Sequence, residues 1–261
     1  PCSLWLRKHP QAPYIVPTTL ILVLLFITPI IFVIVISFTN YRLGDAFNHV
    51  NFIGLSNYLR LFNGSEKAFG YSVYISLLMM VVGTLCQLVL GMLCAMIINQ
   101  EFKFKGLVIA CLIVPIAMTP SIVSQIWKLM FNTDFGVVNY FLENLFGTRV
   151  TWLDRGHALT AVMIATVWQY TPFVTLMLYA GLRSLPESPY ESAKIEGAGV
   201  FQQFIYITLP LMKKLIILCA LLRSIDMLKA FDIPYVLTQG GPGNATKVLG
   251  ILIYDIGFGE T

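Results

Sequence analysis

Residues 186–199 read PESPYESAKIEGAG, a polar island between two long apolar segments. Ser188 is followed three residues later by Glu191, the spacing of a capping box. Pro189 then falls on the first helical position, where its missing N–H costs nothing. The island therefore predicts that a helix starts at this point.

The same island predicts a joint and a second helix. Gly197 and Gly199 favour a left-handed end after about two turns. A short helix over 200–207 is expected next, with Pro210 in the first turn of a further helix. We call residues 186–210 the 186–210 element. Local signals alone fit either an ordinary structured loop or a rigid helix pair on the end of a transmembrane hairpin.

The composition is that of a protein embedded in a membrane. Hydrophobic residues make up 57% of the chain and charged residues 11%, whereas a soluble domain has about 25% charged residues. The mean hydropathy is +0.77. The net charge of +4 includes no basic run suited to nucleic acid, so no nucleic-acid partner is expected. The five cysteines form no CxxC pair, which favours apolar packing over disulfides or a metal site.

Apolar runs predict an all-α polytopic bundle, whose helices need about 20 residues each to cross the bilayer. The predicted spans are 14–38, 71–98, 107–131, 158–182 and 208–237. The third span contains Pro115 and Pro120, which neighbouring helices or water can accommodate. Residues 247–261 are interpreted as the approach to a last helix that is missing here, so about six transmembrane helices are expected in all.

Positive charges divide almost evenly between the two sides of the predicted membrane. The loops on the side of the N-terminus are shorter, and the positive-inside rule counts charges near span ends in short loops. We therefore expect residues 1–13 to be a cytoplasmic segment, and the 186–210 element to be cytoplasmic as well. Residues 14–261 are predicted to form one transmembrane domain. In the opposite loop, 132–157, Trp152 is predicted to anchor at the membrane interface.

Three sequence elements resemble those of binding-protein-dependent ABC importer permeases. Glu191-Ser192-Ala193, followed by Gly197 and then ITLP at 207–210, matches the spacing of the EAA loop, with Ser192 where alanine is commoner. FIGLSNY at 52–58 resembles the F-x-G-L-x-N-Y element of the sugar-permease branch. TQGGP at 238–242, with Thr246, resembles its T-x-G-G-P…T element. The chain thus resembles the maltose and glycerol-3-phosphate type of permease subunit, with a type I importer fold.

This resemblance implies that the 186–210 element couples the chain to a cytoplasmic ATPase subunit. The residues expected to make or position that contact are Tyr190, Glu191, Ser192, Ala193 and Gly197. Packing of Tyr190 and Ile195 against this chain's own helices is a nonpolar alternative that can coexist with docking. The implied partners are a second homologous permease, two ATP-binding cassette subunits, a periplasmic or lipid-anchored solute-binding protein, and the lipid of a bacterial cytoplasmic (inner) membrane.

Charged residues recur every three positions along the predicted fifth span: Arg223, Asp226, Lys229 and Asp232. Charge inside a bilayer is expensive and normally faces a partner or a water-filled cavity. Two interpretations stay open, which are a self-neutralising stripe at helix-neighbour spacing and direct contact with a ligand. Lys229 and Asp232 lie nearer the outer end and are candidates for gate or interface residues.

The resemblance also implies a carbohydrate held midway through the membrane against the fourth and fifth spans. The corresponding positions are Thr166, Gln169, Tyr170, Phe173, Arg223, Asp226, Met227 and Ala230. Aromatic faces suit sugar C–H groups, and the polar groups suit hydroxyls. An uncharged oligosaccharide is the first expectation. An anionic sugar or a glycerol phosphate ester is the second, because the fork of Arg223 can bind a carboxylate or phosphate.

Other function classes lack their motifs in this sequence. There is no GxxxxGK[ST], so we expect no cofactor in this chain and place ATP and Mg²⁺ on partner ATPase subunits. HExxH and GxSxG are also missing, so the chain is not expected to be an enzyme. The serious alternative is an ion-coupled secondary transporter, because broken helices and buried charges also serve ion coupling. A secondary transporter has no need for the 186–210 element.

Overall fold

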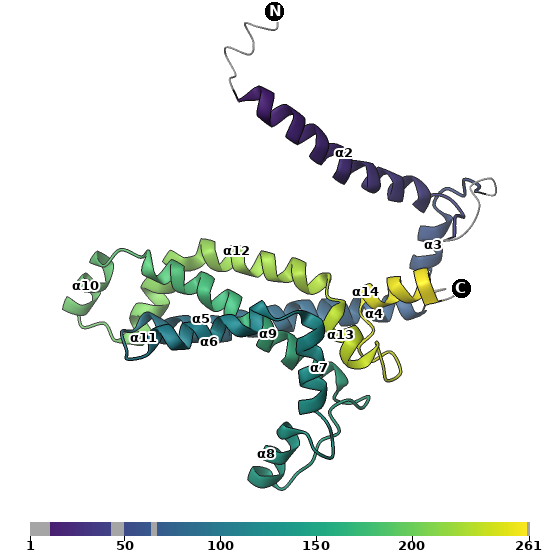
Figure 1. The fold of residues 1–261 in the computed structure, drawn as a ribbon. Coiled ribbons are helices and arrows are strands. Elements are labelled where there is room, and N and C mark those ends of the chain that lie inside the picture. The colour runs from purple at the N-terminus through teal and green to yellow at the C-terminus, as the bar shows by residue number, and fades with distance from the viewer. Residues whose placement is uncertain (1–10, 43–49, 64–66, 260–261) are drawn as a thin grey trace, which may run out of the picture. The chain divides into compact units, whose positions relative to one another are not determined.

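The computed structural model of the chain describes residues 11–42, 50–63 and 67–259, so most of the predicted segment 1–13 lies outside the described residues. The chain divides into two compact units, residues 1–67 and 68–261. Within the described ranges the regular structure is helical, apart from an isolated antiparallel bridge between Thr39 and Phe52. This confirms the predicted all-α class (Figure 1).

The first unit contains α2 (Ala12–Ser37) and the short α3 (Ser56–Phe62). Helix α2 is the first predicted span. The most apolar 18-residue window within Tyr14–Ser37 has a mean hydropathy of 3.2, and none of that window is buried. A helix that is apolar on every side suits an environment of lipid or of other membrane helices.

The FIGLSNY sequence closes the C-terminal end of α2. Gly54 has a φ of +60°, which permits the turn that leads into α3. The Asn57 side-chain amide donates to the carbonyls of Ser37 and Thr39, both at 2.9 Å. These carbonyls lie at the helix end, where no intrahelical donor remains. A turn and a short helix thus follow the span, and Asn57 explains why this sequence occurs there.

Long apolar helices run alongside one another in the second unit (Figure 1). They are α4 (Lys67–Leu78), which continues through the π-helical η2 (Met79–Gly83) into α5 (Thr84–Asn99), then α9 (Ala158–Arg183) and α12 (Leu209–Leu228). The second and fourth predicted spans are thereby confirmed. Gly91 lets α5 approach α9 closely, because a Cβ at Gly91 would lie 2.7 Å from Cγ1 of Val174.

The third predicted span is wrong as a single helix. Helix α6 (Lys105–Ala117) and helix α7 (Pro120–Met130) meet at an angle of 101°. Thr119 adopts an extended conformation, as a residue before proline prefers, and Pro120 starts the new helix. The Gln169 side-chain amide donates to the Met118 carbonyl at 3.1 Å, which satisfies a group freed by the break.

The fifth predicted span is wrong at both ends. The helix is continuous from Val200 to Leu228, because α11 (Val200–Gln203) continues through the π-helical η3 (Phe204–Thr208) into α12. The expected separate helix over 200–207 is therefore the first part of this span. At the other end α12 stops at Leu228, and α13 (Asp232–Thr238) is a distinct helix.

The TQGGP loop connects α13 to α14 (Leu249–Tyr254), which continues into η4 (Asp255–Gly259). The hydroxyl groups of Thr238 and Thr246 lie 2.6 Å apart and hydrogen-bond to each other. The Thr246 hydroxyl also donates to the Gly241 carbonyl at 3.0 Å. The two threonines of the element therefore close the loop on itself.

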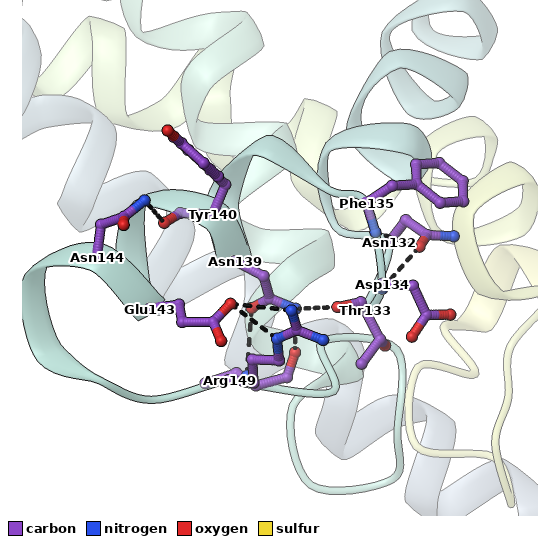
Figure 2. Close-up of polar contacts among 10 residues, drawn as sticks. Asn132, Thr133, Asp134, Phe135, Asn139, Tyr140, Glu143, Asn144 and Arg149 are labelled. Atoms are coloured by element: carbon purple, nitrogen blue, oxygen red, sulfur yellow. Dashed lines mark hydrogen bonds and ion pairs between the residues drawn. The ribbon is translucent and has the colours of Figure 1, made fainter.

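Helix α8 (Val137–Phe146) lies in the loop between α7 and α9 (Figure 2). The buried Asn139 amide donates to the carbonyls of Thr133 and Val150, at 3.3 and 2.9 Å. Its oxygen accepts from the Val150 N–H at 3.2 Å and from the Trp152 indole N–H at 3.1 Å. The Trp152 ring also packs on Phe131, with centroids 5.1 Å apart. The ring and the N–H of Trp152 thus both contact this loop and the end of α7, and its role as a membrane-interface anchor stays a prediction.

Replacing Asn139 with alanine is expected to loosen this loop. The Val150 and Trp152 donors would lose their acceptor, and each buried unsatisfied group costs about 1–3 kcal/mol. We expect amide hydrogen exchange over residues 133–152 to rise at least about tenfold. Asn144→Ala is the matched control, because Asn144 is exposed and donates only to the Tyr140 carbonyl among the contacts in Figure 2. Equal exchange in the two variants would contradict the role of Asn139.

Candidate functional site

The 186–210 element begins with α10 (Ser188–Ile195). Its N-cap is Glu187, which already has helical dihedral angles, and no side chain caps the helix. The predicted Ser188 capping box is therefore wrong, because Ser188 lies inside the first turn. Pro189 falls in that turn too, one position later than predicted. Glu191 remains in the first turn, where a carboxylate interacts favourably with the helix dipole.

The joint after α10 depends on one glycine rather than two. Gly197 has a φ of +79°, as a left-handed helix end requires. Gly199 is extended, with a φ of −68°, so the prediction of a left-handed Gly199 is wrong. Gly199 instead precedes α11 as its N-cap, and its N–H donates to Oε1 of Gln202 at 2.9 Å.

Tyr190 ties α10 to the start of α12. Its hydroxyl hydrogen-bonds to the Thr208 hydroxyl at 2.9 Å, within η3. Ala193 is buried, whereas Ile195 is 88% exposed, so the expected packing of Ile195 against this chain's own helices is wrong. Val200 and Phe201 are also exposed, which the sequence did not single out. The element therefore presents apolar side chains outward from an anchored helix.

A pocket of about 360 Å³ lies between α9, the end of α12 and the start of α13. It contains most of the predicted ligand positions, namely Thr166, Tyr170, Arg223, Asp226, Met227 and Ala230. Gln169 lies outside its lining and supports the α6–α7 break instead. Phe173 also lies outside it and is 37% exposed. Lys229 and Asp232, which the sequence singled out as gate or interface candidates, also line the pocket. The lining residues that sequence reasoning missed are Pro120, Phe231, Ile233 and Pro234.

Arg223 is the electrostatic centre of this pocket. Only 4% of its side chain is exposed. Its Nε donates to Oε1 of Gln87 at 2.8 Å, and Nη1 donates to Oδ2 of Asp226 at 2.9 Å. Its guanidinium carbon lies 4.3 Å from the centroid of the Tyr170 ring, in cation–π geometry. Helices α5, α9 and α12 thus each contribute one contact to the same cation.

Sequence reasoning missed Gln87, which is fully buried in α5. Its Nε2 donates to the Thr166 carbonyl at 3.4 Å while its oxygen accepts from Arg223. The available signal was an amide side chain within an otherwise apolar span, because buried polar groups in a membrane need partners.

The charged residues of the predicted fifth span form part of the expected self-neutralising stripe. Nζ of Lys229 lies 3.5 Å from Oδ1 of Asp226, so Asp226 pairs with Arg223 and Lys229 at once. Asp232 does not extend the same helix, because it starts α13 after the break. Within the described residues, no group of three or more His, Cys, Asp or Glu is placed to hold a metal ion. The groups that line the pocket can make ionic contacts and hydroxyl hydrogen bonds beside an aromatic ring.

Comparisons with known proteins agree on one family. The family model described as "Binding-protein-dependent transport system inner membrane component" matches residues 87–260. The chain is 40% identical over 205 residues to the trehalose/maltose transport system permease protein MalF of Thermococcus litoralis, covering 78% of this chain and 69% of that protein. It is 30% identical over 252 residues to the sulfoquinovosyl glycerol transport system permease protein SmoG of Agrobacterium fabrum, covering 94% and 81%.

A solved structure shares the fold. A chain of a bacterial alginate ABC transporter, solved in complex with an alginate pentasaccharide-bound periplasmic protein, superposes with a TM-score of 0.81 at 21% identity. The match covers 97% of this chain and 85% of that chain. By its family match and its relatives, this chain belongs to the inner-membrane permease components of binding-protein-dependent ABC transporters.

Proposed function

We propose that this chain is a translocation subunit of an ATP-driven importer that passes a carbohydrate across the membrane by alternating access. One arrangement carries the proposal. Helices α9 and α12 are joined at one end by the 186–210 element, and α13, which lines the pocket, lies toward the other end of α12 (Figure 1). Movement of α10 can therefore be transmitted along the helix that contains α12 toward the pocket.

The 186–210 element is proposed to dock on a partner ATPase subunit, which supplies ATP and Mg²⁺. Docking buries apolar surface, and the exposed Ile195, Val200 and Phe201 provide it. The Tyr190–Thr208 hydrogen bond and the Gly197 turn are proposed to transmit movement into α12. This assignment places the element and the N-terminus on the cytoplasmic side.

Further partners follow from the family. We propose a second homologous permease, two ATPase subunits and a periplasmic or lipid-anchored solute-binding protein. Helix α2, which is apolar on all sides, is available to lipid and to a partner permease. The relatives named above transport trehalose or maltose and sulfoquinovosyl glycerol, which supports a carbohydrate as the cargo.

The pocket is proposed to bind this carbohydrate. Tyr170 offers an aromatic surface, Thr166 a hydroxyl and Asp226 a half-exposed carboxylate. Together they can contact the C–H groups and hydroxyls of a sugar. A pocket of this size with a few convergent polar groups is typical of small-molecule sites.

Replacing Tyr170 with alanine is expected to lower transport about tenfold, the effect of losing about 1.4 kcal/mol of contact with the sugar and with Arg223. Phe173→Ala is the matched control, because Phe173 lies on the same helix outside the pocket. Uptake is measured in proteoliposomes that contain the assembled complex and its loaded binding protein. Equal uptake by the two variants would place the sugar elsewhere.

A further inference from the structure

We propose that Asp226 sets the charge selectivity of the pocket, so that the pocket admits uncharged sugars and disfavours anionic ones. The inference rests on the proposed function, in that the pocket is the path of the cargo. Its support comes from how the charges of α12 are arranged, and it names the class of substrate that the proposed function leaves open.

Arg223 is buried and already paired with a carboxylate. Its Nε and Nη1 are used by Gln87 and Asp226, its face is covered by Tyr170, and its side chain is only 4% exposed. Recognition of a carboxylate or phosphate by arginine uses two parallel N–H groups. The buried guanidinium already has a carboxylate partner in Asp226, so its charge is compensated within the pocket lining.

Asp226 is the acidic group that stands between the two cations. Its carboxylate bridges Nη1 of Arg223 and Nζ of Lys229, at 2.9 and 3.5 Å, while half of its side chain remains exposed. An anion that approaches Arg223 or Lys229 therefore comes close to this carboxylate, which is paired with both cations. Like charges at short range repel more strongly in a pocket than in water. The pocket therefore disfavours anions, although it contains an arginine and a lysine.

An uncharged sugar meets the same groups differently. The exposed face of the Asp226 carboxylate can accept hydrogen bonds from sugar hydroxyls. The 69% exposed Lys229 ammonium can donate to sugar oxygens without giving up its place near Asp226. Neither contact requires the ion pairs to separate. Asp226→Asn would change the balance, because it leaves Arg223 and Lys229 in place without the intervening negative charge.

The test measures the local potential with charged thiol reagents. Ala230, which lines the pocket, is changed to cysteine in the assembled complex after the native cysteines are replaced by serine. The introduced thiol is then modified with a cationic and with an anionic methanethiosulfonate. We expect Asp226→Asn to raise the anionic-to-cationic rate ratio about tenfold or more, because one charge is removed near the thiol in a partly enclosed site.

Two controls make the result specific. Asp226→Glu keeps the charge and is expected to keep the wild-type ratio. Asp232→Asn removes a negative charge from the same pocket without touching Arg223 or Lys229, and is expected to change the ratio less than about threefold. An unchanged ratio in Asp226→Asn, or an equal change in Asp232→Asn, overturns the proposal. Co-elution of the chain with its partner permease and the ATPase subunits in size-exclusion chromatography verifies that each variant complex has assembled.

Protection by sugars separates this inference from the proposed function. Maltotriose is expected to slow modification in wild type and in Asp226→Asn, whereas a trisaccharide of uronic acids is expected to slow it only in Asp226→Asn. A shifted reagent ratio without protection by either sugar would contradict sugar binding in the pocket while leaving the role of Asp226 intact. Protection of the wild type by the uronic acid trisaccharide would overturn the role of Asp226 and keep the sugar site.

Discussion

Gly197→Pro is expected to abolish the stimulation of ATP hydrolysis by loaded binding protein, with a loss of at least about 100-fold. Gly197 has a φ of +79°, whereas the proline ring fixes φ near −65°. Proline also removes the N–H that donates to the Lys194 carbonyl at 3.1 Å. Helix α10 can then no longer end where it does, and its orientation relative to α11 changes.

The control for this variant is Gly199→Ala. Gly199 has a φ of −68°, and an added Cβ would come no closer than 3.9 Å to its nearest neighbour, Oε1 of Gln202. Alanine is therefore expected to leave ATP hydrolysis unchanged. The measurement compares ATP hydrolysis by the two assembled complexes with and without loaded binding protein. Normal stimulation in Gly197→Pro would show that the 186–210 element is not the coupling site.

Arg223→Gln is expected to reduce sugar transport at least about 100-fold. The change leaves Oε1 of the fully buried Gln87 without its donor, and a buried unsatisfied group costs about 1–3 kcal/mol. It also removes the cation from Tyr170 and from one oxygen of Asp226. Three helices lose a shared contact at the pocket, so both the site and its link to α12 are affected.

Lys229→Gln provides the comparison for Arg223. It removes the same charge from the same pocket, but Lys229 is 69% exposed and its ion pair is long, at 3.5 Å. Exposed ion pairs contribute only about 0–1 kcal/mol, so transport is expected to fall less than about fivefold. Transport is measured with the sugar that the cognate binding protein carries. Similar losses in the two variants would mean that pocket charge matters and that the buried network does not.

A span could be predicted from the sequence where a long apolar run by itself indicates a helix surrounded by lipid. Helices α2, α5 and α9 follow from composition and length alone. The break between α6 and α7 could not be predicted from the sequence, because Pro115 and Pro120 both occur in the predicted third span and only one of them starts a new helix. Pro115 stays inside α6, whereas Pro120 begins α7 with support from Gln169. That support comes from a residue far along the chain.

The site was predictable to a similar degree. Counting residues from the EAA loop identified the pocket residues of α9 and α12, because the position of a residue in a regular helix can be extrapolated over several turns. Phe173 and Gln169 lie outside the pocket lining, because the surroundings of a side chain depend on which neighbour each helix face meets. Gln87 was missed because the family spacing does not reach α5. The prediction that Ser188 caps α10 is wrong for a local reason, because Glu187 already has helical dihedral angles.

The central claim is that ATP hydrolysis on a partner drives this permease. Its most direct test is uptake by proteoliposomes that contain the chain with its partner permease, ATPase subunits and binding protein, using a sugar already shown to bind that binding protein. We expect uptake to require ATP on the side of the 186–210 element and to persist when ionophores collapse all ion gradients. Uptake that follows an imposed proton or sodium gradient without ATP would contradict the account and favour a secondary transporter.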